Sequence, residues 1–314
     1  MATALETRFR ESMAEFYTIY TKMRDTSVFS APSGGSAFMN VDASLGFFKP
    51  TVIAIGGEPE EFTGTVNYNT PVAAAQTYET KVFVYGVEMD RNLLQKTDAI
   101  ARGEVTRILT TGARRAVEDM DKRLTTLLLT GETAGNLVTG AFFSATSALP
   151  GGSTLDNLVG TGVSGSSTEV RAAAHAARAR TLSMRGAGNQ LMNNGWPRLG
   201  LMYDPRATNG TPIHQNVMDA LYPDTLEAGQ KIPEGSVVPM PNPYLNGTIA
   251  DLWFFDLDTP EKSLIVGWQQ MPLLESTMPY SDAWITNRRA RYVASWAYEV
   301  AFGNNAAAVL ANDA

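Results

Sequence analysis

The longest regular pattern in this chain runs from Asp90 to about Thr130, where apolar residues recur at the spacing of an α-helix. Asp90 is expected to be the N-cap, and Gly131 the residue that stops the helix. Gly103 and Gly112 weaken the pattern by about 1 kcal/mol each relative to alanine. Such a helix would be about 55–60 Å long, roughly three times the average, and we expect it to lie across a sheet. The apolar positions are Leu94, Ala101, Val105, Ile108, Ala116, Met120, Leu124, Leu127 and Leu128.

Residues 61–88, just before this helix, predict a β-hairpin. Its arms are EFTGTVNYNT (61–70) and TYETKVFVYGVEM (77–89), and both alternate apolar with polar residues. An isolated hairpin is marginal in water, so this one is expected to lean on another part of the protein. One face of the first arm carries Phe62, Val66 and Tyr68; the faces of the second carry Val82 with Val84, and Phe83 with Tyr85 and Val87.

After residue 236 the chain again has the patterns of strands, in SVVPM, TIADLWFFDLD, EKSLIVGWQQMPLLES and RRARYVASWAYEVAFGNN (288–305). The last of these is the most aromatic segment, and an alanine-rich tail follows it. We expect these strands to pair beneath the long helix. Its aromatic residues are Tyr292, Trp296, Tyr298 and Phe302.

The N-terminal residues 5–24 have the spacing of an amphipathic helix, which would pack either on its own domain or on a neighbouring subunit. SAPSGGSA (30–37) is expected to be a flexible break.

Residues 165–235 predict a compact α/β subdomain inserted between the hairpin-and-helix half and the returning strands. Ser166 and Glu169 form a capping box for a helix, RLGLMYD (198–204) has the pattern of a strand, and TPIHQNVMDALY (211–222) that of a second helix with Thr211 as N-cap and Pro212 at its first position.

No pattern of catalytic or metal-binding residues emerges from the sequence. There is no cysteine, and the two histidines, His175 and His214, belong to no zinc-binding pair. Asp256 and Asp258 are expected in a solvated turn, with a cation site as the alternative. The acidic residues Glu118, Asp119 and Asp121 are expected on the helix surface.

Composition limits the partners. The formal net charge is −7, whereas a surface that grips DNA phosphates is usually basic. No stretch of 18 apolar residues occurs, so no helix is expected to span a membrane. Two groups of arginines could pair either with acidic patches of adjacent subunits or within the chain, at about 0–1 kcal/mol for each exposed pair. They are Arg114 and Arg115, and Arg288, Arg289 and Arg291.

The order of elements, and three segments in particular, resemble the HK97-type major capsid proteins of tailed phages. The first segment, VFVYGVEMDRNLLQ (82–95), is similar to the join between the extended loop and the spine helix of that family. The second, RLGLMYDPRATNGTPIHQNVMDALY (198–222), is similar to the strand and helix of its axial domain. The third, RRARYVASWAYEVAFGNNAAAVLA (288–311), resembles its terminal segment, with an aromatic spacing nearest the Mu-like head subunits.

The resemblance implies an α+β fold of the HK97 type and a structural, non-enzymatic role without a cofactor or metal. It implies an N-terminal arm (1–50), an extended hairpin loop (51–88), a first peripheral part with the spine helix (89–155), an axial domain (156–245) and returning peripheral strands (246–314). The aromatic strand at 288–305 would then be buried beneath the spine helix.

The function implied is a major head protein that assembles into hexamers and pentamers of an icosahedral shell around double-stranded DNA, in the host cytoplasm and then in the virion. Its partners would be copies of itself, a separate scaffolding protein, a portal, optionally a decoration protein, and weakly contacted DNA, with no membrane. Lys81 lies in the hairpin, but no partner for a cross-link can be named. The candidate interface residues are Phe9, Phe16, Phe62, Tyr68, Lys81, Phe83, Tyr85, Arg114, Arg115, Arg288 and Arg289.

Two alternatives remain open from the sequence. One is an encapsulin-like shell of the same fold that holds enzymes instead of DNA. The other is a hydrolase that uses Asp256 or Asp258.

Overall fold

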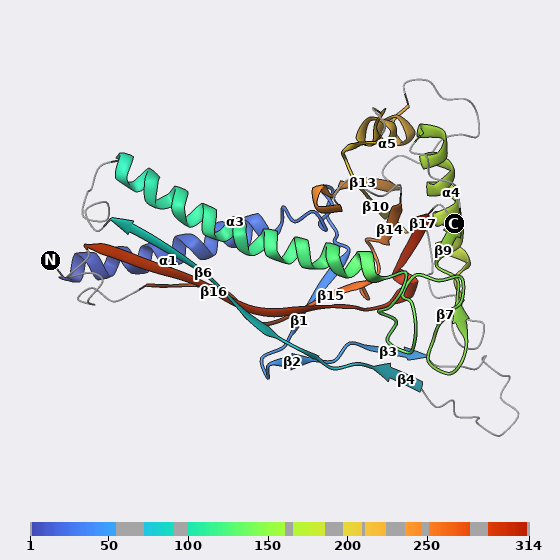
Figure 1. Cartoon of the computed structure of the whole chain (residues 1–314), viewed down its shortest axis with the longest axis horizontal. Helices are drawn as coiled ribbons and strands as arrows, with labels where there is room; N and C mark the ends of the chain where they lie inside the picture. Colours follow the sequence, from blue (N-terminus) through green and yellow to red (C-terminus); the bar gives the residue numbers. More distant parts are fainter. Residues whose placement is uncertain are drawn as a thin grey trace, which may run out of the picture.

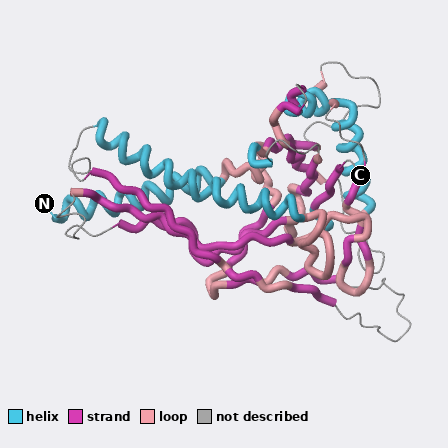
Figure 2. The backbone as a smooth tube through the Cα atoms, viewed as in Figure 1, coloured by secondary structure: helices cyan, strands magenta, loops and turns pink. Residues whose placement is uncertain are grey.

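The structure is a computed structural model that describes residues 2–54, 72–90, 99–160, 166–185, 197–208, 211–223, 236–245, 251–276 and 288–312. It is an elongated molecule with two bodies (Figure 1). In the long body, α1 and α3 lie along a four-stranded sheet; the second body has a five-stranded sheet flanked by α4 and α5 (Figure 2). Among the described helices, none is both long enough and apolar enough to cross a membrane. The helices are α1 (Ala2–Arg24), α3 (Ala99–Thr130), α4 (Ser167–Ser183) and α5 (Ile213–Leu221), with 3₁₀ turns η2 (Pro243–Leu245) and η3 (Asn305–Ala307).

The four-stranded sheet has the order β1-β15-β16-β6, so β1 and β6 are its edges. β1 pairs with β15 in parallel, and the other pairs are antiparallel. The central strands, β15 and β16, follow residue 263, whereas the edge strands, β1 and β6, come from residues before 91, so this body is built from both ends of the chain. Its strands are β1 (Phe38–Asp42), β6 (Lys81–Asp90), β15 (Leu264–Ser276) and β16 (Arg289–Phe302).

The long helix is confirmed over Ala99–Thr130, where its apolar stripe is buried. It ends where expected, since the Gly131 amide bonds back to the Leu128 carbonyl. The predicted N-cap is wrong, because Asp90 is the last residue of β6 and pairs with Arg289. Alternation through 81–90 keeps the backbone extended to that point. The buried stripe consists of Leu109, Ala113, Ala116, Val117, Met120, Leu124 and Leu128.

The aromatic segment at 288–305 is a core strand beneath α3, as predicted. Tyr292, Trp296 and Tyr298 of β16 are each at most 4% exposed. Burying a large apolar side chain contributes about 1.5–3 kcal/mol, so this strand is a main source of the stability of the long body. Asp119 of α3 accepts hydrogen bonds from the Tyr298 hydroxyl (2.7 Å) and the Trp296 indole (3.3 Å). Asp119 is half-buried at the helix surface, where it also satisfies the polar ends of two buried rings.

The pairing of the predicted hairpin stays a prediction, because its first arm, 61–70, lies outside the described residues. Most of its second arm is β6, which pairs with β16. The two faces of that arm are nevertheless as expected, with Phe83 and Tyr85 half-buried toward α3 and Val82 and Val84 exposed. Alternation reveals which residues share a face, but not which strand is the partner. A two-stranded ribbon does extend from this place: β2 (Phe47–Phe48) pairs with β5 (Tyr78–Glu79), and β3 (Thr51–Ala54) with β4 (Val72–Ala75).

The five-stranded sheet carries the predicted α/β subdomain. Its order is β13-β10-β14-β17-β9, with β10 parallel to β13 and β17 parallel to β9. All five residues of β10 are buried: Leu201 faces the cluster with α4 and α5, and Met202 faces the core shared with α3. The two bodies are thus joined through one hydrophobic core. The strands are β9 (Leu158–Gly160), β10 (Leu199–Tyr203), β13 (Val237–Pro241), β14 (Leu252–Asp256) and β17 (Ala308–Asn312).

Two of these strands, β14 and β17, come from the range 246–314 that the sequence assigned to the peripheral domain. We therefore propose to place 252–256 and 308–312 with the axial domain. The alanine-rich tail is a buried strand between β14 and β9, which the sequence analysis missed. Small residues give little periodic signal, yet they suit a strand packed tightly on both faces.

Helix starts in this body follow the predictions in one of two cases. The capping box of Ser166 with Glu169 is present at the start of α4. The N-cap expected at Thr211 is wrong, because Thr211 and Pro212 form β12, which pairs with β11 (Ala207–Thr208), and α5 begins at Ile213. A short strand pair competes with the helix start there. A further pair, β7 (Ser147–Ala148) with β8 (Thr154–Leu155), lies in the glycine- and serine-rich stretch before α4.

The N-terminal helix packs on its own subunit, on α3 and β15. Phe16 and Tyr20 are each 1% exposed. The segment at 30–37 is a tied turn rather than a flexible break, since Ser30 and Ser36 form a β-bridge. Arg198 donates to the Ser33 carbonyl (3.0 Å) and pairs with Asp258 (3.1 Å), which fastens the turn to the second body.

Where the N-terminal arm leaves α1, a buried carboxylate of α3 holds it. The Ser27 hydroxyl donates to Asp121 at 2.6 Å, and the Val28 amide donates to the second carboxylate oxygen at 3.4 Å. Asp121 is 4% exposed, so the expectation of a surface position is wrong. The sequence gives no sign of this contact, because 94 residues separate Ser27 from Asp121.

Burial raises the pKa of Asp121 from 3.8 to about 6, against the two hydrogen bonds, which lower it, while Glu118 adds to the rise. The folded state therefore binds this proton more tightly than the unfolded state. Between pH 4 and pH 6 the free energy of unfolding consequently falls as pH rises. Above pH 6 the ionised, buried carboxylate destabilises the fold.

We expect Asp121→Asn to remove this pH dependence. In the wild type, Asp121 should make the free energy of unfolding larger at pH 4 than at pH 7, by on the order of 2 kcal/mol. Urea denaturation of the unassembled subunit across pH 4–7 measures it as the difference between wild type and variant, in which other carboxylates cancel. Parallel curves for the two proteins would show that Asp121 has an ordinary pKa.

The two glycines within α3 differ in their surroundings. A Cβ on Gly112 would lie 3.4 Å from the Phe16 ring of α1 and 3.9 Å from Tyr85, whereas a Cβ on Gly103 would meet nothing within 4 Å. Gly112 is therefore a close-packing position between helices, and Gly103 is an ordinary weak point of the helix.

We accordingly expect Gly103→Ala to raise the free energy of unfolding by about 0.5–1 kcal/mol through helix propensity. Gly112→Leu should lower it by about 1–3 kcal/mol, because the side chain must displace α1. Denaturant titration of the two variants measures both changes. Equal effects at the two positions would contradict the packing of Phe16 on Gly112.

Candidate subunit-contact surface

Helices cover the sheet of the long body on one side only; on the other side the base of the ribbon covers β15 near Gly267, and the rest of that side is open. Along β16, Tyr292, Trp296 and Tyr298 point to α3, so Val293 and Ser295 point to the opposite side. On that side Val82 and Val84 of β6 are 68% and 69% exposed, and Leu273 of β15 is 47% exposed.

These side chains form one patch because of the strand register. Val84 pairs with Ser295, and Ser295 pairs with Leu273, so the three lie in a row across the sheet. Val82 precedes Val84 by two residues on β6 and lies on the same face. We call Val82, Val84, Leu273, Val293 and Ser295 the open sheet face. Contiguous apolar surface of this kind is typical of an interaction site.

The ribbon formed by β2 to β5 is the second apolar surface. It extends from the start of β6 on the side of the sheet away from α3 (Figure 1). Its exposed apolar residues are Leu45, Phe47, Ile53 and Val72, of which Leu45 at 81% is the most exposed.

The base of the ribbon is anchored by hydrogen bonds and packing. Thr80 donates to the side chain of Gln269 (2.6 Å), and the Phe48 and Tyr78 rings stack with centroids 5.6 Å apart. A Cβ on Gly267 would lie 2.2 Å from the Phe48 ring, so β15 must carry glycine where the ribbon crosses it. The ribbon is therefore rigid at its base and apolar further out.

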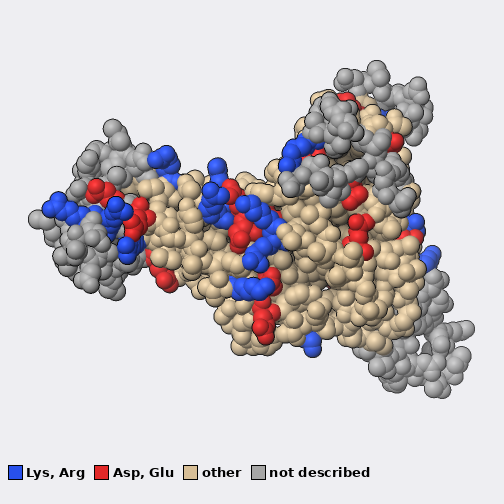
Figure 3. All heavy atoms as spheres, viewed as in Figure 1, with Lys and Arg blue, Asp and Glu red and all other residues tan. Residues whose placement is uncertain are grey.

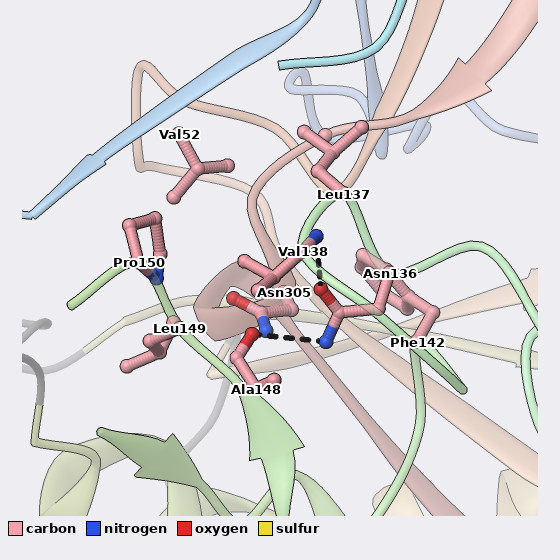
Figure 4. A pocket seen from close by; sticks show the side chains of 10 residues that line it. Val52, Asn136, Leu137, Val138, Phe142, Ala148, Leu149, Pro150 and Asn305 are labelled. Atoms are coloured by element: carbon pink, nitrogen blue, oxygen red, sulfur yellow. Dashed lines mark hydrogen bonds between the residues drawn. The ribbon is translucent and has the colours of Figure 1, made fainter. Parts of the chain in front are cut away.

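A small cavity lies where β3 passes the second body, between Val52 and Pro150 and around Asn136 and Asn305 (Figure 4). Asn136 donates to the Ala148 carbonyl (3.0 Å) and accepts from the Val138 amide (2.9 Å). At about 10 Å³ the cavity is at the lower limit for one water molecule. It is a packing feature of the ribbon base, not a ligand site.

An open groove of about 520 Å³ runs between α3 and β16, and charged side chains line it. Glu299 pairs with Lys81 (2.7 Å) and lies 3.7 Å from Arg123, whose guanidinium lies over the Phe83 ring at 4.1 Å. These groups neutralise one another, so the groove offers no free nucleophile or base.

Asp256 and Asp258, the two candidate acidic residues, are both engaged in contacts within the chain. Asp256 accepts from the amides of Asp258 and Thr259 (2.9 and 3.1 Å), and Asp258 pairs with Arg198. The predicted turn is present, but Asp256 is buried rather than solvated, at 5% exposed. Among the described residues, no three His, Cys, Asp or Glu side chains are placed to share a metal ion.

Several predicted interface residues face their own subunit. Phe16 is buried against α3, Phe83 packs on Tyr298 (5.2 Å), and Tyr85 is half-buried in the same core. These aromatic residues were predicted to be at the interface because they are large. Large apolar side chains also contribute most to a hydrophobic core, and that is where these residues pack. Lys81 is exposed but paired with Glu299, and Phe62 and Tyr68, like the side chain of Phe9, lie outside the described part.

Some of the predicted interface arginines pair within the chain, and others remain available for contact with an adjacent subunit. Arg289 and Arg291 bind Glu88 (2.7 and 2.6 Å), and these hydrogen bonds hold the pKa of Glu88 below its usual range. Arg115 pairs with Glu118 (3.0 Å). Arg114 and Arg288 are exposed, and their contact with another subunit stays a prediction.

The residues that the sequence analysis missed are Val82, Val84 and Leu273. The signal for the first two was available, because they alternate with Phe83 and Tyr85, which had been placed on the opposite face. Leu273 carries no such signal, since register shifts between Trp268 and Leu273 change which side chains face outward.

No protein-family model matches the chain. No curated protein matches it either. Solved structures do match over nearly the whole chain, at identities that show the fold alone.

The capsid of the cyanophage P-SCSP1u has a TM-score of 0.55 at 12% identity, covering 91% of this chain and 86% of that one. The virus-like particle from Pyrococcus furiosus has a TM-score of 0.54 at 10% identity, covering 96% and 98%. The procapsid of bacteriophage JBD30 has a TM-score of 0.51 at 13% identity, covering 100% and 77%. With its long helix on a mixed sheet and its second α/β body, the chain is an α+β protein with the HK97 fold.

Proposed function

We propose that this chain is a shell-forming structural protein, the major capsid protein of a tailed phage, which assembles into hexamers and pentamers of an icosahedral shell. The HK97 fold supports the shell, and the aromatic spacing of 288–311 supports a place near the Mu-like head subunits. The proposed role is non-enzymatic.

The observation that carries the proposal is the pair of apolar surfaces on one side of the molecule. The ribbon, with Ile53 and Val72, and the open sheet face, with Val82, Val84 and Leu273, are both uncovered. A ribbon laid on a sheet face would remove both from water. Such a contact joins two different surfaces, so it is heterologous and generates rings when the rotation closes.

The ribbon that covers this face must belong to another subunit. β5 runs into β6 with only Thr80 between them, so the ribbon continues beyond the end of β6 that holds Lys81. Val82 and Val84 lie in the opposite direction along the strand. A chain this tightly tied at Phe48 and Thr80 cannot fold its ribbon back over its own sheet without breaking those contacts.

The proposed contents of the shell are double-stranded DNA, contacted weakly because the chain is acidic overall. A separate scaffolding protein, a portal and optionally a decoration protein complete the proposed set of partners. The protein would assemble in the host cytoplasm and remain in the virion.

A shell that holds protein cargo is the second candidate. It is favoured by the likeness to the Pyrococcus furiosus virus-like particle, which covers nearly the full length of both chains. Nuclease-treated particles purified from a producing cell distinguish the two. Protected DNA supports the phage capsid, and a co-purifying protein without nucleic acid supports the cargo shell.

We expect Val82→Glu combined with Val84→Glu to abolish shell assembly while leaving the subunit folded, because both positions are exposed. Sedimentation and negative-stain electron microscopy would show free subunits or capsomers in place of shells. Circular dichroism and denaturation should match those of the wild type.

The matched control is Leu129→Glu, which places a charge on an apolar residue, 40% exposed, on α3 rather than on the open sheet face. It should assemble as the wild type does. If the double variant forms normal shells, the open sheet face is not a subunit contact. If the wild type forms no shell under any condition, the proposed shell function is wrong.

A further inference from the structure

The outer face of α3 carries a row of cations. Arg107, Arg114, Arg115 and Lys122 are exposed, and their spacing places them within one stripe of the helix. The stripe is about 22 Å long at 1.5 Å per residue. Figure 3 shows basic side chains, with acidic ones among them, over the middle of the molecule, where α3 runs in Figure 1.

The stripe continues onto the second body through η2. The Lys122 ammonium lies 5.7 Å from the centre of the Tyr244 ring. Burial raises the pKa of Tyr244; Glu118 and Asp121 add to this rise, and Arg114 and Arg115 act against it, so charges of both signs on α3 act on this ring. Arg206 donates to the Pro243 carbonyl at 2.6 Å, which places a fifth cation beside η2.

One acidic residue, Glu118, lies within the stripe and offsets part of its charge. Glu118 is engaged by Arg115, and the partner of Arg206, Asp204, has a side chain that is only 1% exposed. Arg114 and Lys122 take part in no ion pair within the part of the chain that is described. A local positive surface thus stands on a chain whose net charge is −7.

This stripe lies on the side of the sheet opposite the open sheet face. In a shell where neighbouring ribbons cover the open sheet face, α3 stays free of that contact. The exposed residues between the cations, such as Thr111, are polar, and the large exposed apolar residue of α3, Leu129, lies beyond the stripe. Protein–protein interfaces usually have apolar side chains at their centre, whereas binding to a nucleic-acid backbone depends mainly on positive charge.

We propose that Arg107, Arg114, Arg115 and Lys122 of α3, extended by Arg206, form the surface on which the phosphate backbone of duplex DNA lies. The inference rests on the proposed function, for which it identifies the face of the subunit that meets the contents of the shell. The contact is to phosphates and reads no bases. Each subunit binds weakly, in the range of about 10⁻⁴–10⁻⁶ M that is typical of non-specific binding, so the DNA stays free to move.

The test measures binding of the full chain to a labelled duplex of about 24 base pairs over a range of salt concentrations. The stripe variant is Arg114→Gln with Lys122→Gln. The control is Lys49→Gln with Arg185→Gln, which removes two exposed cations elsewhere, one between β2 and β3 and one just after α4. The slope of log affinity against log salt should become shallower by about 2 in the stripe variant, at about 0.9 per phosphate contact. The control should keep the slope of the wild type.

Equal slopes for the stripe variant and the control would overturn the proposal. So would a stripe variant that loses shell assembly but keeps its DNA affinity, since the arginines would then contact another subunit or an acidic assembly partner. Electron microscopy of the same samples scores assembly separately. A slope difference without shells in any sample would support the DNA surface and refute the shell function. Shells with equal slopes would support the shell function and refute the DNA surface.

Discussion

The packing of α3 on β16 is the interaction on which the rest of the molecule depends. Tyr292, Trp296 and Tyr298 bury their rings against the helix, and Asp119 satisfies the polar groups of two of them. β16 pairs with β6 from the first half of the chain and leads through η3 into β17 of the second body. One strand therefore fixes the helix, the base of the ribbon and the second sheet relative to one another.

Buried carboxylates of α3 extend this control to the N-terminal arm. In the fold, the Asp121 carboxylate is removed from water and accepts hydrogen bonds from a hydroxyl and an amide of the arm. Its pKa is raised, so the effect of burial on the pKa is larger than that of those hydrogen bonds. A contact of this kind fixes the position of the arm more than it stabilises the fold. The cost of desolvating a buried charge offsets much of the energy gained from its hydrogen bonds. The arm is thus located by a polar contact and held by Phe16 and Tyr20.

The sequence predicts the parts of this fold whose signal is local. The helix at 99–130, the capping box at Ser166 and the burial of the aromatic strand all follow from spacing alone. Pairing is not local: the partner of β6 lies some 200 residues away, and the alanine-rich β17 has no period to read. The sequence placed Val82 and Val84 on the face opposite Phe83 and Tyr85, but it did not predict that face as the contact surface. The aromatic residues were predicted to be at the interface because they are large, whereas they are packed in the core.

A sheet with helices on one side only has two different outer surfaces. The side without helices carries the ribbon and the exposed Val82, Val84 and Leu273, with Glu88, Glu275 and Arg291 beside them. The side with α3 carries cations on a helix whose apolar stripe is already used by the core. Burial of one helical stripe leaves the opposite stripe to solvent or to a charged partner. The same helix that makes the fold possible therefore also separates the surface that we propose joins subunits from the surface that we propose faces a polyanion.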